Sequence, residues 1–510
     1  MQKIGRASAQ VAGRFLFLGV SVQILLGICW GVRSFGIFPE FGDSYTWLKA
    51  SETLVCDDYM GIGYPLFLML VKGIESISSI PYTFFVYTVQ ILIAFYAGVV
   101  FLRACGVTGK KIFLCWGSLA LLTFPCAMQS HLAVLPNSPG YSFLLLELSA
   151  VIRILRQDAV AEDGETTAPA RPLHGLFEAG IWWALSTLCV VENLYLGLVP
   201  LIVLWLIHLW QLRSRKTEKK RVGRELLLLL AMAGILFTLV PMWQTPGSYG
   251  KAENTVSAAM MRRFSWTHMR EEEEYDEWPE QLRTWMTWKE MRNAGYYAGT
   301  MESGIQKTLE DRFGKAEAQK IFREYAGYHL KTYTSDNIHQ IAWDCLGYAM
   351  PTVLLQLLLD GRGYDSFSGR NVDIMMTGDP RLTELLLKYS SWWFLSGIAV
   401  VVVSCMICGI IAMRRQKKEK TVPDRSLFWK ISGVCVITAA GMILWYTMRD
   451  AGCLDYKNGL LPGSLWLVGM ILWTDRTISA GDTEDNPSKQ NREMQQLVKK
   501  NFGISMNIPA

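Results

Sequence analysis

Residues 394–413 read "FLSGIAVVVVSCMICGIIAM", a run of twenty residues without a charged side chain. An α-helix rises about 1.5 Å per residue, so this run reaches about 30 Å, the thickness of the hydrocarbon core of a bilayer. In lipid, a single segment of this length satisfies its backbone hydrogen bonds by forming a helix. The run therefore predicts a membrane-spanning helix, and with it an all-α integral membrane protein.

The composition of the whole chain agrees with this prediction. Of its 510 residues, 51% are hydrophobic and 19% are charged, whereas soluble domains carry about 25% charged residues. The formal net charge is +5, and the basic residues stand in short clusters beside apolar runs. This pattern indicates a lipid bilayer as the partner and argues against nucleic acid. The eleven cysteines show no metal-ligand spacing, so no cofactor is predicted and metal dependence stays open.

The apolar runs predict about ten spanning helices, with the positive charges on one side. Basic clusters such as "RSRKTEKKRVGR" (213–224) and "RRQKKEK" (414–420) fall in even-numbered connections. Positive residues favour the cytoplasmic side, so the N-terminus is predicted to be cytoplasmic and the odd connections to lie outside the plasma membrane. The predicted spans are 12–32, 82–104, 111–128, 139–156, 175–191, 193–211, 225–243, 390–413, 427–447 and 458–475.

These spans divide the chain into four parts. Residues 1–243 form an N-terminal membrane module, and its first outer loop covers 33–81. Helical periodicity within 244–388 predicts a large helical loop outside the membrane. Further spans then cover 389–475, and a polar cytoplasmic tail covers 476–510. Two apolar segments, 62–76 and 344–359, stay ambiguous between spans and helices that lie along the membrane surface.

The first outer loop contains an unusually acidic stretch, "GDSYTWLKASETLVCDDYMGIGYPLF" (42–67). A carboxylate that is partly shielded from water at the membrane surface suits a general base that takes a proton from a hydroxyl. We interpret Asp57 and Asp58 as solvated loop charges. Asp43 is the stronger candidate because of the residues that surround it.

Three elements in a fixed order resemble the start of the GT-C glycosyltransferases. "GDSYTWLKAS" (42–51) places an acidic residue before a tyrosine and a small residue, and "GYPLF" (63–67) is an aromatic-proline turn. "FPCAMQSHLAVLPNSPGYSFLLLEL" (124–148) looks like the third span, second outer loop and fourth span of that family. The resemblance covers roughly residues 10–245. The chain departs from the family at Asn137 and Ser138, where a second acidic residue is expected.

The resemblance implies an inverting hexosyltransferase, similar to bacterial protein mannosyltransferases and lipopolysaccharide-core transferases. Its donor would be a polyprenyl-phosphate sugar, and its acceptor a glycan, lipid or protein of the cell envelope. Asp43 would be the general base, with Tyr45 and Tyr64 shaping the substrate site. The departing phosphate needs cationic or amide donors. For this role we single out His131, Arg362 and Arg370.

Two other functions are compatible with the sequence. A flippase or transporter for lipids or polysaccharides would carry ionisable residues inside the membrane, and Glu147 in "FLLLELSAV" (143–151) is such a residue. An O-antigen-type polymerase or ligase would typically bring an arginine-rich outer loop. Residues 259–283 contain four arginines, but also four consecutive glutamates that weaken an anion-binding role.

Overall fold

The structure, a computed structural model, describes residues 2–35, 44–56, 60–107, 111–162, 172–211, 219–243, 275–290, 305–350, 380–416, 425–450 and 460–484. Within these ranges every regular element is an α-helix, and the backbone bridge between Met60 and Val190 is isolated. The prediction of an all-α protein is confirmed for this part of the chain.

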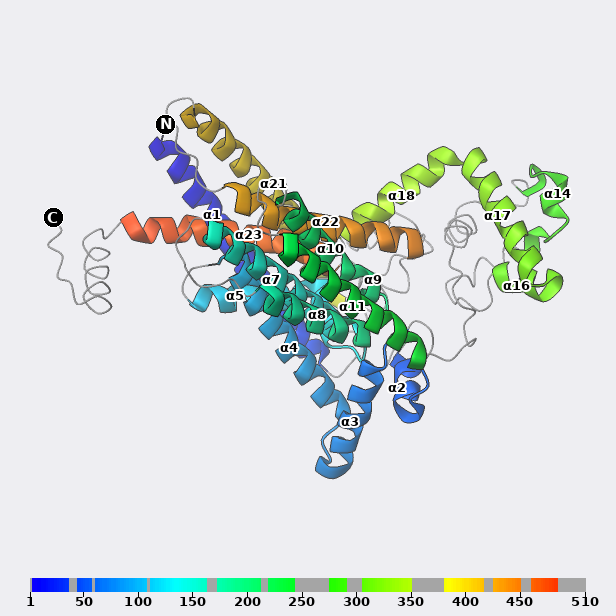
Figure 1. The fold of residues 1–510 in the computed structure, drawn as a ribbon. Helices are drawn as coiled ribbons and strands as arrows, with labels where there is room; N and C mark the ends of the chain where they lie inside the picture. The colour runs from blue at the N-terminus through cyan, green and yellow to red at the C-terminus, as the bar shows by residue number, and fades with distance from the viewer. Residues whose placement is uncertain are drawn as a thin grey trace, which may run out of the picture.

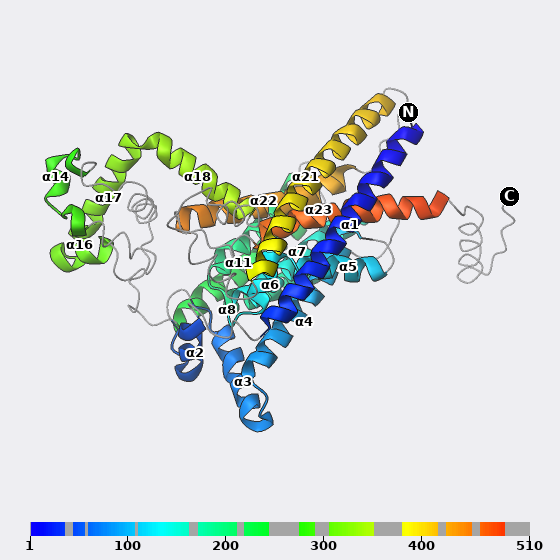
Figure 2. The ribbon, with the colours of Figure 1, turned by 180° about the vertical axis from the view of Figure 1, so that it is seen from behind.

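Long helices form a bundle, and shorter ones join them (Figures 1 and 2). The bundle contains α1 (Gln2–Ser34), α4 (Tyr82–Cys105), α5 (Lys111–Leu122), α7 (Asn137–Glu162), α8 (Pro172–Cys189), α10 (Leu198–Gln211), α11 (Lys219–Trp243), α21 (Pro380–Gln416), α22 (Arg425–Asp450) and α23 (Leu460–Glu484). The helices in the connections between them are α2 (Ser44–Thr53), α3 (Gly63–Ser78), α6 (Pro125–His131) and α9 (Asn193–Leu196).

Among the described residues, six helical segments are long and apolar enough to cross a membrane. They are Ala9–Ser34, Tyr82–Cys105, Asn137–Asp158, Asn193–Gln211, Val222–Trp243 and Lys430–Thr447. The bent pair of α5 and α6 brings the number to seven if the two helices count as one span. The membrane assignment is thus supported, but the predicted number of ten spans is met only in part. Helices α8, α21 and α23 cover the remaining predicted spans without belonging to the six.

Contacts between helix ends show that the bundle has two distinct ends. At one end, Trp30 Nε1 donates a hydrogen bond to Thr383 Oγ1 (2.8 Å), which joins the end of α1 to the start of α21. We call this the loop end, because α2 also lies there. At the other end, Arg153 near the end of α7 forms an ion pair with Glu178 near the start of α8 (2.5 Å). We call this the basic end. In each contact the end of one helix lies beside the start of another, as expected for helices that run antiparallel to each other.

The predicted third span, 111–128, is not one straight helix. α5 ends at Leu122, and α6 begins at Pro125 after a bend of 79°. Proline lacks a backbone N–H and disfavours the helical conformation at the residue before it. Phe124 accordingly has an extended backbone, with φ −57° and ψ 130°. The bend ends α5 early and leaves α6 and the following turn at the loop end.

The described part of the segment between α11 and α21 has a hydrophobic core of its own. In Figures 1 and 2, α14 (Glu280–Arg283), α16 (Ile305–Phe313) and α17 (Lys315–Thr332) stand apart from the bundle. α18 (Thr334–Ala349) instead packs on α22, where the rings of Tyr348 and Tyr446 lie 5.8 Å apart. We call the following residues the aromatic core: Tyr275, Trp278, Leu282, Met286, Leu309, Ala318, Ile321 and Tyr325.

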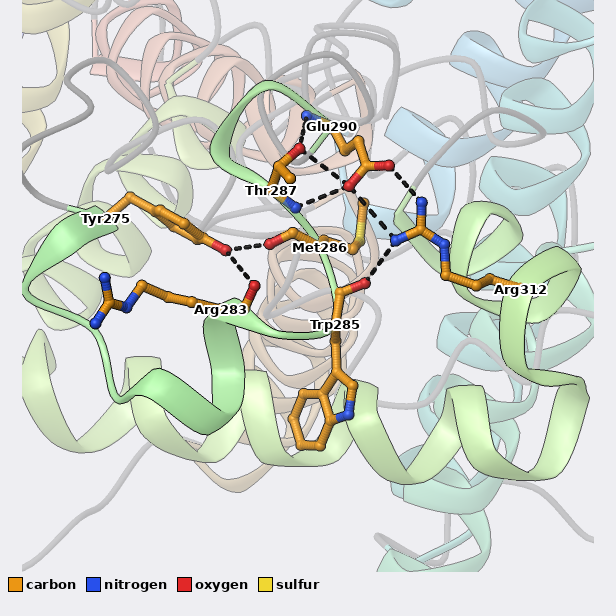
Figure 3. A network of polar contacts seen from close by, with 7 residues as sticks. All are labelled: Tyr275, Arg283, Trp285, Met286, Thr287, Glu290 and Arg312. Atoms are coloured by element: carbon orange, nitrogen blue, oxygen red, sulfur yellow. Dashed lines mark hydrogen bonds and ion pairs between the residues drawn. The ribbon is translucent and has the colours of Figure 1, made fainter.

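A polar network fixes the turn that follows α14 (Figure 3). Arg312 on α16 donates to the carbonyl oxygen of Trp285 (2.9 Å) and pairs with the carboxylate of Glu290. Glu290 also accepts the backbone N–H of Thr287 (2.8 Å). The Arg312 guanidinium holds the pKa of Glu290 below its usual value, and burial raises the pKa of Tyr275 to about 12. A charged carboxylate therefore fastens this turn to α16.

Replacing Glu290 by Gln should loosen this turn at neutral pH. The folded pKa of Glu290 lies below the unfolded value of about 4.3. The ion pair therefore stabilises the fold above the unfolded pKa, and this contribution is lost as the pH falls through the folded pKa. We expect faster hydrogen–deuterium exchange than wild type in peptides covering residues 275–290 at neutral pH. The difference should shrink and then vanish as the pH falls through the folded pKa of Glu290.

The matched control is Glu317→Gln, which removes an exposed pair with Lys320 (3.2 Å) on α17. An exposed pair of this kind contributes little to stability, so exchange in this variant should equal that of wild type. Unchanged exchange in E290Q at neutral pH would show that the ion pair does not hold the turn.

Candidate functional site

The helix that carries the first acidic stretch is fastened to the loop end of the bundle. The hydroxyl of Ser44, at the start of α2, donates to the carbonyl oxygen of Val134 in the turn between α6 and α7 (3.0 Å). Trp47 is buried and packs edge-on against Tyr64 of α3, with ring centroids 5.7 Å apart and planes at 85°. Aromatic pairs favour this arrangement. α2 is therefore held against both α3 and the α6–α7 turn.

One carboxylate of the acidic stretch has a structural role. Glu52 on α2 pairs with Lys72 on α3, with an Nζ to Oε1 distance of 3.1 Å. Gly61, just before α3, lies directly on the end of α8. A Cβ atom added to Gly61 would stand 2.2 Å from the carbonyl oxygen of Leu188. Since that distance leaves no room for a side chain, only glycine allows this close approach.

The side-chain amide of Gln90 joins three elements beneath α2. Its Oε1 accepts the hydroxyl of Tyr64 (3.1 Å), and its Nε2 donates to the carbonyl oxygens of His131 and Ala133 (both 3.0 Å). Those carbonyls lie where α6 ends, so no following helical turn continues the hydrogen bonding of α6. The carbonyl oxygen of Ala133 also accepts the backbone N–H of Leu135 (2.9 Å). Gln90 on α4 thus satisfies the end of α6 and binds Tyr64 at the same time.

Two side chains of α6, the helix that Gln90 binds at its end, keep polar atoms without partners. His131 Nδ1 lies 2.7 Å from the hydroxyl of Ser138, at the start of α7, while Nε2 has no hydrogen-bond partner in the described residues. Both amide atoms of Gln129 are buried and likewise lack partners there. Buried polar groups are normally hydrogen-bonded. These atoms are therefore available to a polar ligand.

We call Tyr64, Gln90, Gln129, His131 and Ser138 the loop-end polar cluster. All five side chains are buried, and none is a carboxylate, lysine or arginine. Such neutral donors and acceptors suit hydroxyl groups better than a bare charge. Within the part of the chain that the structure describes, no three His, Cys, Asp or Glu residues converge as metal ligands.

The structure locates three of the six predicted site residues. Tyr64 and His131, far apart in sequence, both contact Gln90 and so belong to one cluster. Tyr45 is on α2 with 71% of its surface exposed, and so it is not packed into the cluster. The remaining three, Asp43, Arg362 and Arg370, lie outside the described residues, as do Asp57 and Asp58.

The sequence analysis missed Gln90 and Gln129, the two glutamines of the cluster. Both stand in otherwise apolar surroundings, in "VYTVQILIAF" (86–95) and "FPCAMQSHL" (124–132). An amide inside a predicted span must find partners within the protein. That rule marks both residues as interior contacts, although it does not identify what they contact.

Comparisons with protein-family models, curated proteins and solved structures gave no match for this chain. The resemblance to GT-C glycosyltransferases therefore rests on its own sequence elements.

Replacing Gln90 by Leu should destabilise the protein more than replacing Tyr64 by Phe. The leucine variant leaves the hydroxyl of Tyr64 and the carbonyl oxygen of His131 without their partner, whereas the carbonyl oxygen of Ala133 keeps the backbone N–H of Leu135 (2.9 Å). Each unsatisfied buried group costs about 1–3 kcal/mol. The phenylalanine variant leaves only the Gln90 oxygen unpaired. Thermal unfolding of the purified protein in detergent checks this order. Equal melting temperatures for Gln90→Leu and wild type would show that the amide does not hold the cluster together.

Proposed function

We propose that this chain is an integral membrane glycosyltransferase of the GT-C type. It transfers a sugar from a polyprenyl-phosphate donor to a cell-envelope acceptor at the outer face of a bacterial plasma membrane. In this proposal Asp43 is the general base, and the loop-end polar cluster contributes to the substrate site.

One observation supports this proposal more than any other. Ser44, which follows Asp43 in the chain, is hydrogen-bonded to the turn that begins directly after His131. The acidic stretch thus begins next to a cluster that has buried polar atoms without partners. A sugar or hydroxyl acceptor needs such donors and acceptors for orientation, and a nearby carboxylate for proton removal. The sequence resemblance places the family's acidic residue at this same point.

The proposed reaction is a single displacement. Asp43 takes the proton of the acceptor hydroxyl as its oxygen attacks the anomeric carbon of the donor sugar. The bond from that carbon to the phosphate oxygen breaks, and polyprenyl phosphate leaves from the opposite face with inversion. His131 would donate to the leaving phosphate, and Arg362 and Arg370 would balance its charge.

Binding at the cluster requires a movement of α2. His131 and Gln129 are fully enclosed in this structure, and α2 is joined to the adjoining turn through Ser44. We therefore expect the substrate to enter after α2 shifts away from the α6–α7 turn, in the way that mobile loops close many enzyme sites. The ion pair of Glu52 with Lys72 would keep α2 and α3 together during this shift.

Changing Asp43 to Asn should lower the rate of sugar transfer about 10²–10⁴-fold, because removal of a positioned general base has an effect of that size. The assay uses membrane vesicles, a panel of polyprenyl-phosphate hexoses and envelope acceptors, with transfer of labelled sugar as the readout. Asp57→Asn is the matched control from the same loop and should retain activity. Full activity of a folded Asp43→Asn variant, or no transfer by wild type from any donor, would refute the proposal.

The proposal also requires the loop end to face outward. In a variant without the natural cysteines, a membrane-impermeant thiol reagent should label Tyr45→Cys in intact cells. It should label Lys111→Cys, an exposed position at the start of α5, only after the membrane is permeabilised. The opposite pattern would place the acidic stretch in the cytoplasm and exclude a donor site at the outer face.

A further inference from the structure

Glu147 is a carboxyl group at the middle of the most buried span. Its helix, α7, provides the candidate span Asn137–Asp158. The most apolar part of this span is 89% buried, against 50% or less in the other five candidate spans. Glu147 lies about 15 Å along the helix from either end of the span. Its side chain is fully enclosed. The group is therefore remote from both membrane surfaces and from the lipid.

Neither carboxyl oxygen of Glu147 has a hydrogen-bond partner among the described residues. The group lies against Gly197, where a Cβ atom would be 2.8 Å from Glu147 Oε2 and 2.3 Å from Cδ1 of Trp183. The indole N–H of Trp183 is directed elsewhere, to the carbonyl oxygens of Asn193 (3.0 Å) and Leu194 (3.2 Å). The surroundings thus offer the carboxyl no neutralising donor.

The ionisable groups on the helices around α7 do not approach this position. α7 packs on α4, α6, α8, α10, α22 and α23. His131 of α6 is bonded to Ser138 at the loop end, and the other lysine, arginine, histidine and acidic side chains that the structure describes on these helices stand near the basic end. They are Arg103, His174, Glu178, His208, Lys430, Asp475 and Arg476. On α7 itself, Arg153, Arg156 and Asp158 are also at that end. The span midpoint therefore holds a carboxyl without a counter-ion.

We propose that Glu147 is a proton-binding site inside the membrane bundle, closed by the backbone at Gly197 that packs against its carboxyl group. An uncompensated charge in such surroundings costs several kcal/mol, so the carboxylate takes a proton and stays neutral in this closed state. The exchange is simple: hydronium gives its proton to the carboxylate, and water is released. This inference is independent of the proposed sugar transfer, because it concerns the interior of the bundle and not the loop end.

The position of Gly197 suggests how the proton leaves. Gly197 stands between α9, which ends at Leu196, and α10, which begins at Leu198, and it continues their candidate span Asn193–Gln211 in helical conformation (φ −71°, ψ −22°). Because Gly197 has no side chain, the backbone of this span packs directly against the carboxyl and closes it off. Ionised Glu147 needs water or a cation beside it. Proton release is therefore coupled to a displacement of the α9–α10 junction from the carboxyl.

Infrared spectroscopy of the full-length protein in lipid nanodiscs tests the site at neutral pH. The wild type minus Glu147→Gln difference spectrum should contain one carbonyl band of an unionised carboxylic acid. Glu147→Asp should shift this band without abolishing it. The matched control, Glu178→Gln, removes a carboxylate that is paired with Arg153, so its difference spectrum should contain carboxylate bands only.

The closure of the site at Gly197 is tested by the rate at which the Glu147 band shifts in D₂O. Gly197→Ala forces a methyl group between Trp183 and the carboxyl, and should make this shift faster than in wild type. Carboxylate bands in the Glu147→Gln difference spectrum would overturn the proton site. An unchanged exchange rate in a folded Gly197→Ala variant would overturn its closure by the junction. Melting temperatures of both variants establish that they are folded.

Discussion

The loop end depends on the hydrogen bonds of the Gln90 side-chain amide. Pro125 ends α5 early, and the short α6 that follows leaves backbone carbonyls inside the protein. Lipid offers these carbonyls no hydrogen bond, so a protein side chain must supply it. Gln90 meets this requirement with its two N–H groups and uses its oxygen to hold Tyr64. One residue thereby fixes the α6–α7 turn, α3 and, through Ser44, the start of α2.

Much of the fold follows from the apolar pattern of the sequence. Runs of about twenty uncharged residues specify helices, and the helices observed at 82–105 and 219–243 begin and end within a few residues of the predicted ones or extend them. The third span shows why local patterns are insufficient. Its apolar run continues through Phe124-Pro125, but proline breaks the backbone and the chain bends by 79°. The proline was present in the sequence, whereas apolarity alone predicted a straight helix.

The candidate site was predictable in a more limited way. Sequence reasoning looked for charges and found Asp43, Arg362 and Arg370, none of which lies in the described residues. It also selected Tyr64 and His131, but it had no means to show that both contact Gln90, because these partners are 26 and 41 residues away along the chain. The loop-end cluster is built from neutral amides and hydroxyls. Their hydrogen bonds depend on tertiary packing, which periodicity and composition do not encode.

The burial of α7 also has a consequence for how the protein is assembled. Its hydropathy of 1.3 is the lowest of the six candidate spans, and a glutamate at its centre makes insertion into lipid less favourable. α7 instead gains its stability from the helices that enclose it. During synthesis, α7 therefore lacks much of its stabilising packing until α8 and α10 emerge from the ribosome. α4, which also packs on α7, is already present at that stage, so we expect α7 to dock on α4 first and to be enclosed fully when α8 and α10 follow.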